Sequence, residues 1–408
     1  MRKFYIVIPT KNRSATLYYS IKTALAQDYE NLEVIVSDNC SSDDTKGVFD
    51  SFKDSRLRYQ RSDRPLAMIN SWEFALSAVN GAGYVHFMGD DNGLVPNAVE
   101  YVNQLIDSTG VSIVHGDVIQ YKWPGLENDF GEISVPIARG VMLVDSKKAL
   151  ANAYKLKIGF SRLPTINIAF VHTDVIEFAK KINGGRYFCA SNPDVYSALL
   201  NSFSVKKYCY SKTPFVINGA SAFSNGGTTQ QAQGVSAFVS DNLNDGYVYH
   251  RSFPPSTAYH LNVYEAYAIA AEKFDAVGEK FDLPMRKIYH SLVKKEYLKM
   301  NRLWLKNDIE EFSRLNNIKA CLPDFAKPQH VANKPNSLNN IQLFNGESFF
   351  ARSRDRLFKN VFNVSNVACV FLSFNPQLKI NILIENCLSR LKWKVRAFFM
   401  GARTVDIR

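Results

Sequence analysis

Short apolar runs alternate with helical patterns over the first hundred residues, and this alternation constrains the fold more than any other feature. The runs span 4–9, 32–38, 57–61 and 84–88, and the helical patterns between them span 14–27, 45–52 and 71–79. Strands separated by helices predict an α/β fold with a doubly wound, mostly parallel sheet. Further along, 111–121 has the pattern of a strand, and 146–154 and 194–200 have the pattern of helices.

Polar residues follow three of the predicted strands at the point where each ends. Thr10 follows Pro9, Asn39 follows Asp38, and Asp90 is followed directly by Asp91. In an open parallel sheet, ligands bind outside the carboxyl ends of the strands. Two adjacent carboxylates repel each other, so they belong in water or on a cation. The sequence therefore predicts a polar ligand site at this edge of the sheet.

Composition indicates an ordinary folded protein in a reducing compartment. Of the 408 residues, 46% are hydrophobic and 21% charged, and the six cysteines form no CxxC pair, which argues against a disulfide framework or a zinc site. No run approaches the roughly 18 to 20 apolar residues that a membrane-spanning helix needs. The first apolar run stops at Pro9 and Lys11, too early for a signal peptide. We expect a cytoplasmic protein, at most attached to a membrane surface.

Four segments follow from pattern and composition. Residues 1–235 are predicted to form the α/β domain, and 236–321 a helical extension. Residues 322–345 contain three prolines and five asparagines without periodicity, which is typical of a linker. Residues 346–408 are predicted to form a basic helical tail, with eleven Lys and Arg against four Asp and Glu.

Within that tail, residues 379–399 place apolar side chains on one helical face with basic residues beside it. Such a helix suits an anionic membrane surface, because long basic side chains reach outward while the apolar face is buried. It is equally typical of an amphipathic helix packed on its own domain, and both interpretations stay open.

Three stretches, in order, resemble the family-2 glycosyltransferases of the GT-A fold, of the bacterial surface-polysaccharide type. They are "IVIPTKNR" (6–13), "VIVSDNCSSDDT" (34–45) and "RSDRPLAMINSWEFALSAVNGAGYVHFMGDDNGLVPNA" (61–98). The resemblance covers roughly residues 1–225. The chain departs from the family pattern at Cys40, where glycine is usual, and at Gly89, which stands at the first position of the Asp-x-Asp motif.

The resemblance implies transfer of a sugar from a nucleoside diphosphate, with UDP expected, and a Mn²⁺ or Mg²⁺ ion on the leaving diphosphate. Carboxylate oxygens are the ligands that these ions prefer. Asp91 is the expected metal ligand, and Asp90 is a ligand or a ribose contact. The alternative is that both aspartates only cap the backbone of a "DDNG" turn.

The resemblance also implies a set of donor-binding residues. Asp38 is expected to accept from the base or the ribose, with Pro9 and Thr10 lining the base and Arg13 nearby. An Asx turn or a helix N-cap is the alternative for Asp38.

Two further residues, Arg64 and Asn70, lie in the stretch that borders the nucleotide in the family, although both could be ordinary surface residues. The Gly-, Ser- and Thr-rich segment 214–231 is either a lid over the substrates or a passive connection.

An inverting transfer needs a general base that takes the proton of the acceptor hydroxyl. The resemblance places an acidic residue at a helix start well after the metal motif, and Asp194, 103 residues beyond Asp91, fits that position. The alternative is an acidic residue favoured only by the helix dipole. His115 and Trp123 are candidates for the border of the acceptor pocket.

The acceptor implied by the resemblance is a growing surface glycan, often carried on a polyprenyl diphosphate at the membrane. Gly89 raises the alternative of an inactive protein that only binds sugar nucleotides. A nucleic-acid binder is a further alternative, because the chain is basic and holds 28 Phe and 20 Tyr. The basic excess lies in the tail, however, so we expect no nucleic-acid partner.

Overall fold

The computed structural model describes residues 1–125, 131–136, 138–222, 237–299, 302–322, 341–344, 348–353 and 360–365. Its N-terminal part is the predicted alternation of strands and helices. The strands are β1 (Phe4–Thr10), β2 (Leu32–Asp38), β3 (Leu57–Arg61) and β4 (Tyr84–Phe87), and the helices between them are α1 (Ser14–Leu25), α2 (Thr45–Asp50) and α3 (Met68–Leu76). The four strands are parallel, in the order β4-β1-β2-β3. The predicted strands and helices are confirmed to within a few residues.

Further strands extend the sheet beyond β4, mostly by antiparallel pairing. They are β9 (Phe170–His172), β6 (Ile113–Lys122), β7 (Gly131–Pro136), β12 (Ser348–Ser353) and β11 (Ile341–Phe344), in that order. Strand β10 (Lys207–Ala220) pairs in parallel with β6 and antiparallel with β5 (Gly93–Leu94) and β8 (Val141–Asp145). The parallel pairing is thus concentrated in the N-terminal strands, and the α/β fold is the one that the resemblance implies.

Alternation of side chains along the strands gives the sheet two apolar faces. In β1, Phe4 and Ile6 belong to one core cluster and Tyr5 and Val7 to the other. The first face is covered by α1 and α4 (Ala98–Thr109), and the second by α3, α5 (Ser146–Tyr154), α6 (Thr173–Ile182) and α7 (Pro193–Ser204). Both faces are therefore buried under helices, as a parallel sheet requires.

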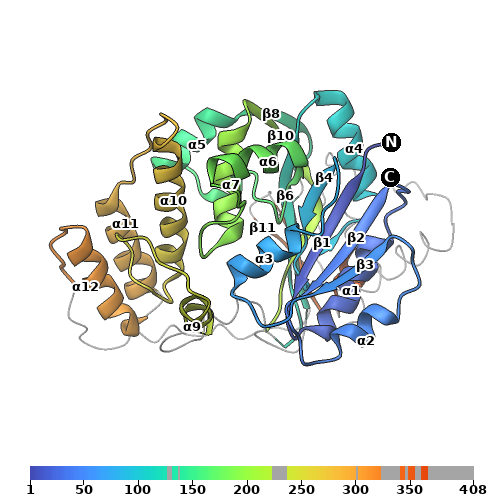
Figure 1. Cartoon of the computed structure of the whole chain (residues 1–408), viewed down its shortest axis with the longest axis horizontal. Coiled ribbons are helices and arrows are strands. Elements are labelled where there is room, and N and C mark those ends of the chain that lie inside the picture. Colours follow the sequence, from blue (N-terminus) through green and yellow to red (C-terminus); the bar gives the residue numbers. More distant parts are fainter. Residues whose placement is uncertain are drawn as a thin grey trace.

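The predicted extension is helical but is not a separate body. It contains α9 (Ala237–Asn244), α10 (Tyr259–Asp275), α11 (Met285–Leu292), a π-helix (Val293–Lys299) and α12 (Lys306–Leu315). Figure 1 shows the sheet on one side of the molecule, α10 to α12 on the other, and α7 between them. Tyr267 and Phe274 of α10 belong to the same core cluster as α7, whereas Leu261 packs with α11 and α12.

The predicted linker and tail are corrected where the structure describes them. Residues 341–344 and 348–353 are the strands β11 and β12, and β12 pairs with β7. Val361 and Val364 are fully buried in the core of the N-terminal domain, and Ser365 Oγ donates to the Leu94 carbonyl at 2.8 Å. The pattern missed these contacts because each depends on a partner far away in the sequence. The rest of the linker, 323–340, and the amphipathic segment 379–399 lie outside the described residues.

The segment 214–231, in which we expected a lid or a connection, is likewise described only in part. Residues 214–220 continue β10, while 223–231 lie outside the described residues. Across the described part of the chain, no helix combines the length and apolarity required to span a bilayer.

Candidate functional site

The carboxyl ends of β1, β2 and β4 meet at one edge of the sheet and bring the predicted polar residues together. Thr10 lies opposite Asp38 in the register of β1 and β2, and Val7 lies opposite Phe87 in β4. Asp90 follows three residues after Phe87, so it reaches the same edge. The prediction that these strand ends share an edge is confirmed.

Asp90 is only 1% exposed, and its two carboxylate oxygens differ in their surroundings. Oδ1 accepts a hydrogen bond from Arg13 Nη1 at 2.9 Å, and this carboxylate raises the pKa of the arginine. Oδ2 is buried without a partner among the described residues, and so is Thr10 Oγ1 on the neighbouring strand. In the described part of the chain, five buried side-chain nitrogen or oxygen atoms have no hydrogen-bond partner, and two of them lie at this edge.

Asp91 is held by residues that follow the ends of β10 and β6. Its Oδ2 accepts from the Ser221 backbone N at 3.2 Å and from Ser221 Oγ at 2.8 Å, while Trp123 Nε1 donates to the Asp91 carbonyl at 2.8 Å. Burial, followed by the neighbouring Asp90, raises the pKa of Asp91 to about 6. A cation at this carboxylate would relieve both effects.

Asn92 and Gly219 fix the turn that contains the two aspartates. The backbone N of Gly219 donates to Asn92 Oδ1 at 2.8 Å, and Ser20 Oγ donates to the Asn92 carbonyl at 2.7 Å. A Cβ at Gly219 would lie 1.8 Å from the Asp91 carbonyl oxygen, so only glycine allows β10 this close to the turn.

Replacing this glycine is therefore expected to damage both stability and the site. Gly219→Ala should lower the free energy of unfolding by about 1 to 3 kcal/mol, the usual cost of overpacking. The matched control is Gly159→Ala, where a Cβ would meet nothing nearer than Ser161 Oγ at 3.7 Å. Thermal unfolding of both variants measures the difference, and equal Tm values would contradict the prediction.

Gly89, where the family pattern has an aspartate, packs against the same turn. A Cβ at this position would lie 3.1 Å from Asn92 Nδ2 and 3.3 Å from Asp91 Oδ1. The side chain of Asn92 thus occupies the space into which a residue at 89 would project. The glycine at position 89, where the Asp-x-Asp motif has an aspartate, thus leaves room for the side chain of Asn92.

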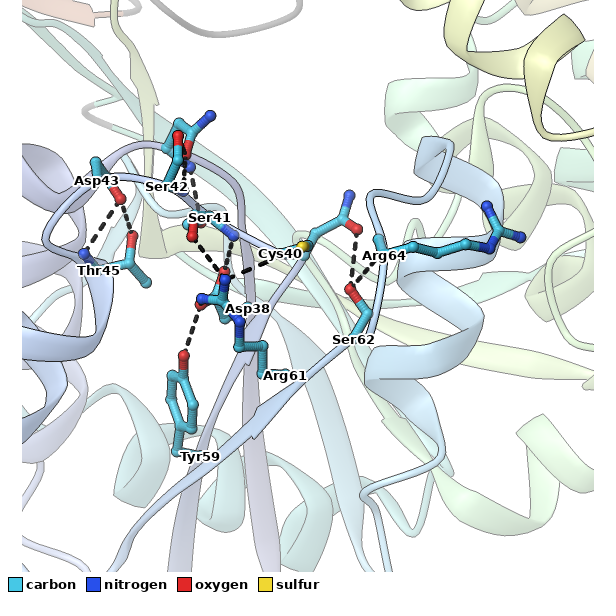
Figure 2. A network of polar contacts seen from close by, with 12 residues as sticks. Asp38, Cys40, Ser41, Ser42, Asp43, Thr45, Tyr59, Arg61, Ser62 and Arg64 are labelled. Atoms are coloured by element: carbon cyan, nitrogen blue, oxygen red, sulfur yellow. Dashed lines mark hydrogen bonds and ion pairs between the residues drawn. The ribbon is translucent and has the colours of Figure 1, made fainter.

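Asp38 is fully buried and accepts three hydrogen bonds (Figure 2). The donors are the Ser41 backbone N at 2.8 Å, Tyr59 OH at 2.6 Å and Arg61 Nη1 at 2.6 Å. Burial and the bond to Asp38 raise the pKa of Tyr59 to about 12, so the phenol stays protonated as a donor. Asp38 therefore orders the turn after β2, as its Asx-turn alternative implies, and any nucleotide contact would add to these bonds.

Arg64 and Asn70 are brought together by a residue that sequence reasoning missed. Asp245, which follows α9, accepts from Arg64 Nη1 at 2.6 Å, from Asn70 Nδ2 at 2.6 Å and from the Ala67 backbone N at 2.9 Å. These bonds lower the pKa of Asp245 despite its partial burial. Both predicted residues thus anchor the C-terminal end of α9 at the border of the site.

Asp194 lies at the first turn of α7 and is partly buried, which raises its pKa. Its backbone carbonyl accepts from Thr165 Oγ1 at 2.9 Å. The carbonyl of Ile166, the residue after Thr165, accepts from the backbone N of Phe87 at 3.0 Å. The segment 165–166 therefore joins the start of α7 to the end of β4. The start of α7 is thus connected to the strand that Asp90 and Asp91 follow.

His115 does not border an open pocket. It is fully buried, its Nε2 faces the Ser161 carbonyl at 3.1 Å, and burial lowers its pKa to about 4. Pro9, at the end of β1, is half-buried beside Thr10.

Within the described ranges, no three His, Cys, Asp or Glu residues form a cluster that could hold a metal by themselves. Asp90 Oδ2 and Asp91 Oδ1 nevertheless suit a divalent cation whose remaining ligands come from a bound diphosphate or from water.

Comparison with known proteins places the N-terminal part in a known context. Residues 5–161 match the model of glycosyl transferase family 2. Over 136 residues the chain is 32% identical to the GalNAc(5)-diNAcBac-PP-undecaprenol beta-1,3-glucosyltransferase of Campylobacter jejuni, an alignment that covers 32% of this chain and 42% of that protein. Over 183 residues it is 26% identical to the UDP-Glc:alpha-D-GlcNAc-diphosphoundecaprenol beta-1,3-glucosyltransferase WfaP of Escherichia coli, covering 44% of this chain and 68% of that protein.

The chain thus spans less than half the length of the first of these relatives. Among solved structures, S. aureus TarS 1–349 in complex with UDP-GlcNAc aligns with 14% identity and a TM-score of 0.44, covering 85% of this chain and 99% of the other.

Proposed function

We propose, from the match of residues 5–161 to the model of glycosyl transferase family 2, that the protein transfers one sugar from a UDP-sugar. The acceptor is a hydroxyl of a growing surface glycan carried on a polyprenyl diphosphate. The transfer inverts the anomeric centre and requires Mn²⁺ or Mg²⁺. The observation that carries the proposal is the pair of buried, unpartnered oxygens, Thr10 Oγ1 and Asp90 Oδ2, at the carboxyl ends of adjacent strands.

Such oxygens point to a ligand. A buried polar atom without a hydrogen bond costs about 1 to 3 kcal/mol, so most are paired in folded proteins. These two lie where an open α/β sheet binds its ligands. A ribose hydroxyl can bind the Thr10 hydroxyl, and a second hydroxyl or a cation can satisfy the carboxylate oxygen of Asp90.

The roles of the acidic residues follow from their surroundings. Asp91 and Asp90 would hold the cation, and the ion pair with Arg13 fixes the orientation of the Asp90 carboxylate. A bound cation supplies Lewis-acid stabilisation of the charge that develops on the leaving diphosphate. Ser221 donates two hydrogen bonds to Oδ2 of Asp91, which leaves Oδ1 of the same carboxylate for the cation.

Asp194 takes the proton of the acceptor hydroxyl. Burial raises its pKa, which makes it a better proton acceptor near neutral pH than an exposed aspartate. The connection of α7 to the end of β4 through residues 165–166 supports this role, because Asp90 and Asp91 follow the same strand.

Donor and acceptor classes rest on the relatives. Both curated relatives described above are beta-1,3-glucosyltransferases named for an acceptor on a diphosphate-linked undecaprenol, and WfaP is named for UDP-Glc. An acceptor of this type lies in a membrane, so we place the protein at the cytoplasmic membrane face. The basic segment 379–399 is the candidate contact with anionic lipid.

The test is calorimetric titration of UDP, GDP and dTDP with and without Mn²⁺, followed by turnover of UDP-glucose with a synthetic α-D-GlcNAc-diphosphoryl lipid. We expect Mn²⁺-dependent binding of UDP and release of UDP during turnover. Binding of GDP or dTDP instead would change the donor. Failure to bind any of the three nucleotides would overturn the transferase assignment.

A further inference from the structure

The helical extension places a buried carboxylate beside the loop that leads into α7. Glu265 lies in α10, is 1% exposed, and has a pKa raised by burial. Its Oε2 accepts from Ser191 Oγ at 2.9 Å, and its Oε1 accepts from Tyr247 OH at 2.6 Å and from the His250 backbone N at 3.2 Å. A residue outside the family-matched segment thus binds the chain just ahead of the proposed base.

Both hydrogen-bond donors of Ser191, the backbone N and the hydroxyl, bind side chains of the extension. Its backbone N donates to Tyr247 OH at 2.9 Å, while its hydroxyl donates to Glu265. Only Asn192 and Pro193 separate it from Asp194, and the proline fixes φ at the helix start. Holding Ser191 in place therefore fixes the direction in which the first turn of α7 presents Asp194.

A second residue of the extension lies near enough to feel the charge of Asp194. Tyr259 begins α10 and is 48% exposed; partial burial of its phenol and then the charge of Asp194 raise its pKa. Within the α/β domain, Thr165 Oγ1 donates to the Asp194 carbonyl. Groups of both the α/β domain and the extension thus surround the start of α7.

We propose that Glu265 is a positioning residue for Asp194, and that the catalytic site is complete only when the extension is docked. This inference rests on the proposed function, because it assumes that Asp194 is the base. A carboxylate suits the task because it only accepts, and its two oxygens can receive all three donors. Misplacing a reacting group by about 1 Å can cost about a hundredfold in rate.

Ser191→Ala tests the link without touching Asp194 or Glu265. We expect kcat to fall roughly tenfold to a hundredfold, with the KM for UDP-glucose and the affinity for UDP unchanged. The matched control is Ser202→Ala, within α7, the helix that follows Ser191. Ser202 is 1% exposed, like the fully buried Ser191, but its hydroxyl donates to Ala198 within α7. UDP-glucose and the α-D-GlcNAc-diphosphoryl lipid serve as substrates for the full chain.

Two variants of the carboxylate keep the test decisive if Ser191→Ala folds poorly. Glu265→Gln retains one acceptor oxygen and the shape of the side chain, so it should keep more of kcat than Glu265→Ala does. Equal kcat values for Ser191→Ala and Ser202→Ala would overturn the proposal. So would a loss of UDP affinity in proportion to kcat, because that would indicate a general defect of the fold.

The outcomes separate this inference from the proposed function. A wild-type chain that binds no nucleotide overturns both. If wild type and Asp194→Asn are equally active, Asp194 is not the base, and Glu265 then has no base to position. If wild type is active and Asp194→Asn is not, the comparison of Ser191→Ala with Ser202→Ala decides the role of Glu265 alone.

Discussion

Asp91→Asn is expected to lower kcat by about 10²- to 10⁴-fold and to abolish the Mn²⁺ dependence of UDP binding. Asparagine keeps the size of the side chain and an oxygen that can accept from Ser221, but it removes the charge that would hold the cation. A metal ion contributes several kcal/mol of transition-state stabilisation in such reactions, and each 1.36 kcal/mol is worth a factor of ten in rate.

Steady-state kinetics and calorimetry with and without Mn²⁺ measure the two effects. Asp50→Asn is the control, because Asp50 lies exposed in α2 and its carboxylate pairs with Lys46 in the i,i+4 arrangement. It should leave both quantities unchanged. Full turnover by Asp91→Asn in the presence of a chelator would show that the reaction needs no cation at this carboxylate.

Asp194→Asn is expected to reduce kcat by about 10²- to 10⁴-fold, the range that a general base contributes. UDP binding should persist with its metal dependence intact, because Asp194 belongs to α7 and not to the strand ends that hold the donor. Loss of turnover together with retained UDP affinity would separate this variant from Asp91→Asn. An active Asp194→Asn variant would send the search for the base elsewhere.

The pH dependence gives Asp194 an independent signature. Its pKa is raised above 3.8 by burial, and the base acts when deprotonated, so kcat should fall as the pH drops through this raised pKa. The folded state holds this proton more tightly than the unfolded state does, so ionisation of Asp194 opposes folding increasingly as the pH rises. Asp194→Asn should therefore be at least as stable as wild type at neutral pH. The residual kcat of this variant should no longer fall as the pH drops through the range in which Asp194 takes up its proton.

The sequence was sufficient to predict where the candidate residues lie on strands and helices, while their roles stay predictions. Asp90 and Asp91 follow a short apolar run, and Asp194 follows a proline at a helix start, so each is visible within a few residues. Arg13 was predicted near the nucleotide, and the structure pairs it with Asp90. That pairing could not be read from spacing, because it depends on how two neighbouring strands end.

The residues that were missed act over long separations. Ser221 binds a residue 130 positions earlier, and Asp245 binds Ala67 178 positions earlier. Neither lies in a pattern that distinguishes it from other surface residues. The same reason explains the strand at 341–344, where prolines and asparagines predicted a linker while pairing with β12 decided the structure.

The incorporation of residues 348–353 and 360–365 into the N-terminal domain has a consequence for the order of folding. Ser365 bonds to a carbonyl 271 residues earlier, and Val361 fills the space beside Gly93. During synthesis the first hundred residues leave the ribosome long before these partners exist, so an apolar surface on α1 and β5 stays open to solvent in the meantime. Long-range contacts of this kind slow folding, and the open surface favours aggregation of the incomplete chain. Chaperone binding to nascent chains should therefore persist until the ribosome has passed residue 365.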